Sequence, residues 1–207
     1  MIKNTLSLAV AGFALAFGSF SAQAALTTLA SWDAAYPGIA GVQFNAVSGA
    51  AGSVALGAHA YKNGILLPNN GVDTFQGQGG VYAPDGLGRA NWSFDFAYQI
   101  STACQGCQAI LRIDSDPSAL SNFIEINLTS IYGAVGLDSW NMEMGFLSPL
   151  NFNPYAATST DFELVIRAAT GANALDTNVT VNVPEPGSLA LVGLALVGAG
   201  FLRRRNA

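Results

Sequence analysis

The chain has 207 residues, of which 51% are hydrophobic and only 10% are charged, with a formal net charge of −5. Residues 25–183 hold four basic side chains against twelve acidic ones, a net charge of −8. Nucleic-acid binding is therefore excluded, because neutralising phosphates requires clusters of Lys and Arg. The apolar residues gather at both ends, and the 159 residues between them suffice for one domain with a hydrophobic core.

The amino terminus is predicted to be a cleavable signal peptide over residues 1–24. Lys3 precedes an apolar run from Leu6 to Phe20, and Ala22-Gln23-Ala24 supplies the small residues that signal peptidase requires. The alternatives are an uncleaved anchor or a core helix, and the Ala-x-Ala ending argues against both. We therefore expect cleavage between Ala24 and Ala25, and export of the chain.

Apolar and alternating runs predict strands through the middle of the chain. In residues 92–100, aromatic and apolar side chains alternate with Ser, Asp, Ala and Gln, which is the period of a half-buried strand. Further strands are predicted over residues 42–47, 53–58, 108–113, 122–132, 161–168 and 176–183. The last two flank Thr170-Gly171-Ala172-Asn173 and are predicted to form a hairpin. Residues 148–159 are predicted to be a long loop.

These strands predict an all-β fold. Residues 25–183 show no sustained helical period, and turn signals such as Pro68-Asn69-Asn70-Gly71 recur between the strands. This pattern favours a single β-sandwich or jelly-roll-like ectodomain. The spacing shows no clear internal repeat, which disfavours a solenoid or a propeller.

Cys104-Gln105-Gly106-Cys107 is predicted to form a disulfide that closes a hairpin turn, because two cysteines in an exported chain favour a disulfide. A redox role would need a following helix that lowers the thiol pKa, and none is predicted. Free thiols are the remaining alternative. A zinc site needs about four ligands, which the single histidine, His59, does not complete with two cysteines.

Asp114-Ser115-Asp116 lies at a strand end, which makes Asp114 and Asp116 weak calcium candidates. The spacing lacks the D-x-[DN]-x-[DN]-G loop with its later Glu, so a solvated turn before Pro117 is preferred. We accordingly expect no metal and no other cofactor.

The sequence also predicts no catalytic residues. A Ser-His or Cys-His arrangement would have to use His59, and its surroundings contain no nucleophile elbow. Glu125, Glu143 and Glu163 are candidates for the carboxylate pair of a glycoside hydrolase, but their positions do not predict that any two converge.

A carbohydrate-binding module is a further possibility, because exposed aromatic rings can stack on sugars. The candidate rings are Trp32, Tyr36, Tyr61 and Trp140.

Residues 184–207 form a distinct carboxyl-terminal segment after Val183. Pro184-Glu185-Pro186-Gly187 precedes an uncharged run over residues 188–202, which predicts a transmembrane helix, and Arg203, Arg204 and Arg205 follow. At about 1.5 Å per residue such a helix is short for a hydrocarbon core of roughly 30 Å, so spanning requires bilayer thinning and snorkelling arginines. The arginines favour a cytoplasmic end, with the domain outside. A buried core helix is the alternative that this basic tail disfavours.

This end of the chain resembles the PEP-CTERM sorting domain of Gram-negative bacteria, over Val183 to Ala207. The resemblance implies recognition by an exosortase, a membrane transpeptidase-like enzyme, with cleavage near Pro184-Glu185-Pro186. Family members are usually encoded beside exopolysaccharide systems, which implies delivery to the cell surface or the extracellular matrix.

Together these features predict a non-enzymatic surface or matrix protein associated with exopolysaccharide or a biofilm. Its expected partners are signal peptidase, exosortase, the inner membrane before processing and exopolysaccharide. A carbohydrate-binding module is the second hypothesis, and a glycan-active hydrolase is the third.

Overall fold

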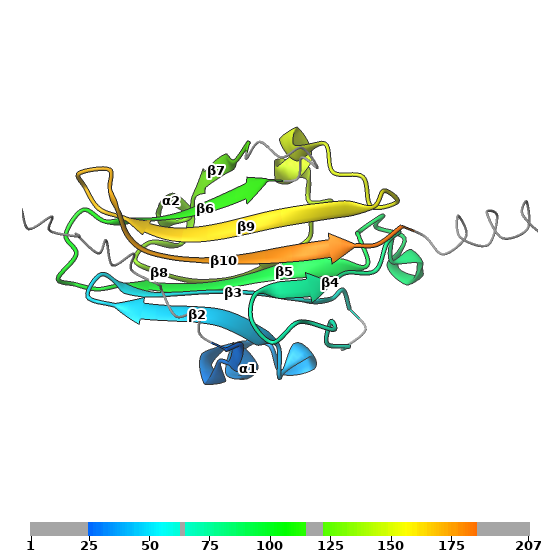
Figure 1. Cartoon of the computed structure of the whole chain (residues 1–207), viewed down its shortest axis with the longest axis horizontal. Coiled ribbons are helices and arrows are strands. Elements are labelled where there is room, and N and C mark those ends of the chain that lie inside the picture. The colour runs from blue at the N-terminus through cyan, green and yellow to red at the C-terminus, as the bar shows by residue number, and fades with distance from the viewer. Residues whose placement is uncertain (1–24, 63–64, 115–121, 186–207) are drawn as a thin grey trace, which may run out of the picture.

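The computed structural model describes residues 25–62, 65–114 and 122–185, which form two β-sheets packed face to face (Figure 1). The first sheet has the strand order β1-β2-β3-β5-β8 and the second has the order β4-β10-β9-β6-β7. Neighbouring strands are antiparallel except that β4 runs parallel to β10. This arrangement confirms the all-β prediction.

The strands are β1 (Thr27–Thr28), β2 (Gln43–Gly49), β3 (Gly52–Ala60), β4 (Thr74–Gln76), β5 (Trp92–Ile100), β6 (Gln108–Asp114), β7 (Ile124–Asn127), β8 (Val135–Trp140), β9 (Thr158–Arg167) and β10 (Asn173–Val183). The helical elements are α1 (Ala30–Ala35) and α2 (Thr129–Tyr132), with the 3-10 turns η1 (Pro37–Ile39), η2 (Ala83–Asp85) and η3 (Gly145–Leu150).

The main hydrophobic core lies between the two sheets. The aromatic face of β5 points inward, and the ring of Phe94 packs on Phe162 of β9 with their centroids 4.4 Å apart. Val179 and Val181 of β10 are fully buried in the same core. Each large apolar side chain buried in this way favours folding by about 1.5–3 kcal/mol, so the alternating pattern of β5 fixes which face of the strand turns inward.

β5 is not half-buried as predicted, because its polar face is covered too. Ser93 and Asp95 are only 2% and 0% exposed. The cover comes from α1 and η1, which follow β1 and lie against the outer face of the first sheet (Figure 1). Trp32 of α1 is fully buried there, with its ring 5.1 Å from that of Phe44. A six-residue helix is too short to show a helical period, so this second layer was not predicted.

Three other predictions need correction. The strand predicted over residues 122–132 is β7 followed by the helical turn α2, because Leu128 turns into the core and the chain then crosses to the first sheet. The loop predicted over residues 148–159 includes part of η3 and the start of β9. β5 and β6 belong to different sheets, so Cys104 and Cys107 do not close a hairpin.

The remaining strand predictions are confirmed. Residues 42–47 and 53–58 lie in or beside the hairpin of β2 and β3, and residues 108–113 lie in β6. The hairpin around residues 170–173 joins β9 to β10, and β10 begins earlier than predicted, with an irregular register between Asn173 and Leu175.

Candidate ligand-binding site

A pocket of about 580 Å³ opens where the end of the first sheet meets α1 and η1. Its sheet side is formed by His59, Ser93 and Ser139, which belong to β3, β5 and β8. His59 pairs directly with Ser93, and Ser139 pairs with Asp95, so the strand register places these side chains on one face. The volume falls within the range of about 300–1,000 Å³ that is usual for small-molecule sites.

The opposite walls of the pocket are mostly apolar. Tyr36 and the η1 turn contribute one wall, while Tyr61 and Met144 come from the segments that follow β3 and β8. Tyr61 also packs edge-on against Tyr82, with ring centroids 5.6 Å apart. This contact holds the Tyr61 ring in place at the pocket wall.

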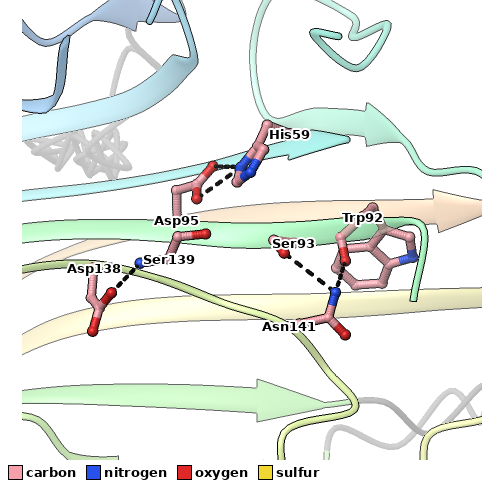
Figure 2. Close-up of polar contacts among 7 residues, drawn as sticks. All are labelled: His59, Trp92, Ser93, Asp95, Asp138, Ser139 and Asn141. Carbon is pink, nitrogen blue, oxygen red and sulfur yellow. Dashed lines mark hydrogen bonds and ion pairs between the residues drawn. The ribbon is translucent and has the colours of Figure 1, made fainter. Parts of the chain in front are cut away.

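His59 and Asp95 form a buried pair at the sheet side of this pocket (Figure 2). Nδ1 of His59 lies 2.8 Å and 3.0 Å from the two Asp95 carboxylate oxygens. Burial raises the pKa of the Asp95 carboxyl, although the charge and hydrogen bond of His59 and a hydrogen bond from Ser139 act in the opposite direction. Because Nδ1 faces both carboxylate oxygens, a neutral imidazole that donates to Asp95 carries its proton on Nδ1 and leaves Nε2 as a hydrogen-bond acceptor.

Asn141 holds the strand ends beside the pair in place (Figure 2). Its Nδ2 donates to the carbonyls of Ala90 and Trp92 at 2.9 Å and 2.8 Å, and to Oγ of Ser93 at 3.3 Å. Its Oδ1 accepts from the backbone N–H groups of Ala90 and Glu143. The hydroxyl of Ser93 is thus contacted by Asn141, while the His59 ring contacts Asp95.

Tyr36 is fixed at the edge of the first sheet by a hydrogen bond of its hydroxyl to Oδ1 of Asp138, at 3.1 Å. Burial, reinforced by the charge and hydrogen bond of Asp138, raises the pKa of Tyr36 to about 12. Its phenol is therefore protonated at neutral pH and its ring is held against the pocket.

The aromatic candidates of the sequence divide into two groups. Trp32 and Trp140 are 0% and 5% exposed and belong to the two hydrophobic cores, so they are not free to stack on a sugar. Tyr36 and Tyr61 are half-buried and line the pocket.

Two of the three glutamate candidates lie together and contact the same arginine. Glu125 and Glu163 flank Arg112 on the second sheet, and each forms an ion pair with it. Glu143 follows β8, beside Arg89, whose guanidinium donates to the Glu143 carbonyl.

Cys104 and Cys107 form the predicted disulfide, which lies in the crossover from β5 to β6.

Asp114, one of the two calcium candidates, ends β6, is 5% exposed and accepts a hydrogen bond from the backbone N–H of Asn122 at 2.8 Å. Asp116, the other calcium candidate, lies outside the described residues. Among the residues that the structure describes, no group of three or more His, Cys, Asp or Glu is placed to hold a metal ion.

Four polar residues around the pocket were not predicted from the sequence: Ser93, Asp95, Ser139 and Asn141. The alternation of β5 marks Ser93 and Asp95 as one face, but nothing in the pattern shows that a short helix covers that face. Knowledge of how β3 pairs with β5 would have provided a signal, because that pairing places the polar residue Ser93 directly opposite His59.

The fold and this pocket define a two-sheet β protein with a small covered site on one outer face. The family model of the PEP-CTERM protein-sorting motif matches residues 182–205, which confirms the resemblance seen at the end of the chain. The motif implies an exported protein that depends on exosortase for its processing. No curated protein and no solved structure matched the chain.

Several positions predicted from the ends of the sequence lie outside the described residues. They are Ala22 and Ala24 of the signal cleavage site, Pro186 of the sorting motif, the helix predicted over 188–202, and Arg203, Arg204 and Arg205. Within the parts of the chain that the structure describes, no helix is long and apolar enough to cross a membrane. Val183, Pro184 and Glu185 are described, and the last two are exposed.

Proposed function

We propose that this chain is a non-enzymatic surface or extracellular-matrix protein that associates with exopolysaccharide and is sorted through its carboxyl terminus. The observation that carries the proposal is the position of the sorting motif relative to the domain. The motif begins at Asn182, and β10 ends at Val183, which is 4% exposed. Pro184 and Glu185 follow at once and are exposed, so a membrane protease would meet extended backbone next to a folded domain.

In this proposal signal peptidase first cleaves after Ala24. The carboxyl-terminal segment then holds the chain in the inner membrane with the domain on the periplasmic side. Exosortase cuts near Pro184-Glu185-Pro186, and the domain proceeds to the cell surface or the matrix.

The test follows the intact mass and the cell fraction of the protein in a host that carries exosortase. The wild-type chain should lose the segment after the motif, and replacing Pro184, Glu185 and Pro186 with Ala should leave it full-length at the membrane. Asn178→Ala, at an exposed position of β10, is the matched control and should be processed normally. A wild-type chain that keeps every residue through Ala207 at its final location would reject processing.

The non-enzymatic part of the proposal is supported by what surrounds the candidate catalytic groups. Ser93 is contacted by Asn141, and the carboxylates of Glu125 and Glu163 are each paired with Arg112. These arrangements suit structural roles better than a nucleophile or a carboxylate pair in a cleft.

A carbohydrate-binding module is the second candidate function, and Tyr36 and Tyr61 are the observation in its favour. Both rings line the pocket and keep part of their surface exposed. Retention of the exported protein on the host's own purified exopolysaccharide, lost on Tyr61→Ala, would support it. Equal elution of both proteins would count against it.

A further inference from the structure

We infer that the pocket between the first sheet and η1 is a binding site for a small neutral molecule with an apolar ring and one hydroxyl group, the class of phenols and aromatic alcohols. This ligand class differs from the sugar of the second candidate function, and it does not depend on how the chain is sorted.

The walls indicate an apolar body for the ligand. Apart from Lys62, the side chains that surround the space away from the sheet are Ala35, Tyr36, Pro37, Ile39, Tyr61 and Met144. Small-molecule sites combine such apolar and aromatic lining with a few placed polar groups. A pyranose, which carries a hydroxyl on most of its carbons, would leave several hydroxyls against these walls without partners, at a cost in affinity.

The charges of the lining indicate a neutral ligand. The pocket's two basic side chains are His59 and Lys62. His59 faces Asp95, and Lys62 lies 3.1 Å from a carboxylate oxygen of Asp85. Since each of these two side chains already has an acidic partner, neither offers an unpaired charge to an anionic or a cationic ligand.

The buried pair supplies the polar contact. Nδ1 of His59 lies 2.8 Å from a carboxylate oxygen of Asp95. This contact orients the imidazole ring and leaves Nε2 to accept a hydrogen bond. Ser139 is engaged by Asp95, and Ser93 by Asn141, so both hydroxyls have partners within the sheet. On a lining that is mostly apolar, the acceptor Nε2 of His59 matches a ligand with one hydroxyl donor.

The experiment measures binding of two fluorinated probes to the protein, in the form in which the host exports it, by ¹⁹F NMR. The probe 4-fluorophenol has the ring and the donor, while 4-fluoroanisole has the same ring and oxygen without the donor. We expect 4-fluorophenol to bind about tenfold more tightly, the effect of one well-placed hydrogen bond. Equal affinities of the two probes, or no binding of either, would overturn the inference.

Two variant pairs locate the binding. His59→Asn keeps an amide N–H near the Nδ1 position for Asp95 but removes Nε2. It should therefore lower the affinity for 4-fluorophenol to that for 4-fluoroanisole, and leave the affinity for 4-fluoroanisole unchanged. Ala35→Trp should obstruct the pocket and weaken both probes, whereas Ala34→Trp, at an exposed neighbour in α1 that does not line the pocket, should change neither. Probe binding that survives Ala35→Trp would place the site elsewhere and reject the inference.

A competition arm separates the two ligand classes. Methyl β-D-glucopyranoside should not displace 4-fluorophenol at concentrations at which 4-fluorophenol itself saturates the protein. Displacement by the glucoside, abolished by Ala35→Trp, would assign the pocket to a sugar and overturn the aromatic class while leaving the sorting proposal intact.

Discussion

Asn141, the residue that follows β8, contacts the beginning of β5 through its side chain. It is fully buried, and both ends of its amide contact backbone groups of Ala90, Trp92 and Glu143. Ser93, which Asn141 contacts, lines the pocket, and Trp140, which precedes Asn141, belongs to the core. The amide of Asn141 therefore fixes the position of the pocket relative to the core.

Replacing Asn141 with Ala should lower the free energy of unfolding by about 1–3 kcal/mol, because it leaves buried backbone donors and acceptors without partners. Urea unfolding followed by tryptophan fluorescence measures this loss. Asn178→Ala removes the same atoms from an exposed side chain of β10 and should change stability by less than about 0.5 kcal/mol. Similar losses in the two variants would show that the Asn141 contacts do not stabilise the fold.

For single residues, the sequence shows which side chains could have a role but not which side chains surround them in the fold. His59 is recognisable as the single imidazole, and the period of β5 places Ser93 and Asp95 on one face. That Asp95 is buried against His59 depends on the register of β3 with β5 and on α1 lying over that face. Both are long-range outcomes of packing, which local alternation does not encode.

At the scale of elements, three strands of the second sheet are joined by charged side chains on their outer face. Arg112 of β6 pairs with Glu125 of β7 and Glu163 of β9, and Arg167 of β9 reaches Glu125 with Nη2 to Oε1 at 2.6 Å and Nη1 to Oε2 at 3.0 Å. The hydrogen bond from Arg167, followed by the charges of both arginines, lowers the pKa of Glu125 below its usual 4.5, although partial burial opposes this.

This network predicts a pH dependence of stability. A carboxylate whose pKa is lowered in the folded state stabilises the fold above its unfolded pKa of about 4.3, and that stability is lost as the pH falls through the folded value. Wild type should therefore unfold about 1–3 °C above Glu125→Gln at pH 7, and this gap should close by about pH 3. Thermal unfolding at both pH values measures it.

Glu143 is the control for this prediction because burial raises its pKa, against the charge of Arg89. A raised pKa gives stability that is present at low pH and lost as the pH rises through the folded value. The gap between wild type and Glu143→Gln should thus shift in favour of wild type on acidification. A gap for Glu125→Gln that is independent of pH would contradict the role assigned to the network.

Strands with a strong period were predictable from the sequence, and short or polar elements were not. β5 and β6 match their predicted ranges almost residue for residue, since alternating or continuous apolar runs dominate them. β8, with the sequence Val-Gly-Leu-Asp-Ser-Trp, has too few apolar residues to be recognised. α2 begins immediately after Leu128, inside a run of strand-forming residues, where the demand to bury Leu128 overrides local propensity.

At the scale of the whole molecule, the two sheets are connected at several places. The side chain of Asn45 in β2 donates to the carbonyl of Asn178 in β10, and the hydroxyl of Thr177 donates to the carbonyl of Asn45. The Cys104–Cys107 disulfide lies in the crossover between β5 and β6, with Cys107 packed in the core. β10 takes part in both of these hydrogen bonds and in the core, and it ends at Val183, beside the sorting motif.

The position of β10 limits where exosortase can cut without damaging the domain. Val181 and Val183 are 0% and 4% exposed, and Val181 and Asn182 pair with Phe75 and Gln76 of β4. The carbonyl of Asn182 also accepts a hydrogen bond from the backbone N–H of Gly77 at 2.8 Å. Cleavage before Val181 would therefore remove two core side chains and residues that pair with β4, and cleavage before Val183 would still remove one buried valine, whereas cleavage after Val183 would remove none of these.

We therefore predict that a chain ending at Glu185 unfolds at the same temperature as the exported protein, and that a chain ending at Thr180 unfolds at least about 10 °C lower. The loss comes mainly from the two buried valines, each contributing about 1.5–3 kcal/mol. A third chain, ending at Glu185 and carrying Val181→Ala and Val183→Ala, should reproduce much of the loss without shortening the backbone. Calorimetry of the three chains measures these differences. Equal unfolding temperatures for the chains ending at Thr180 and Glu185 would show that the end of β10 is dispensable, and would remove the reason to place the cut after Val183.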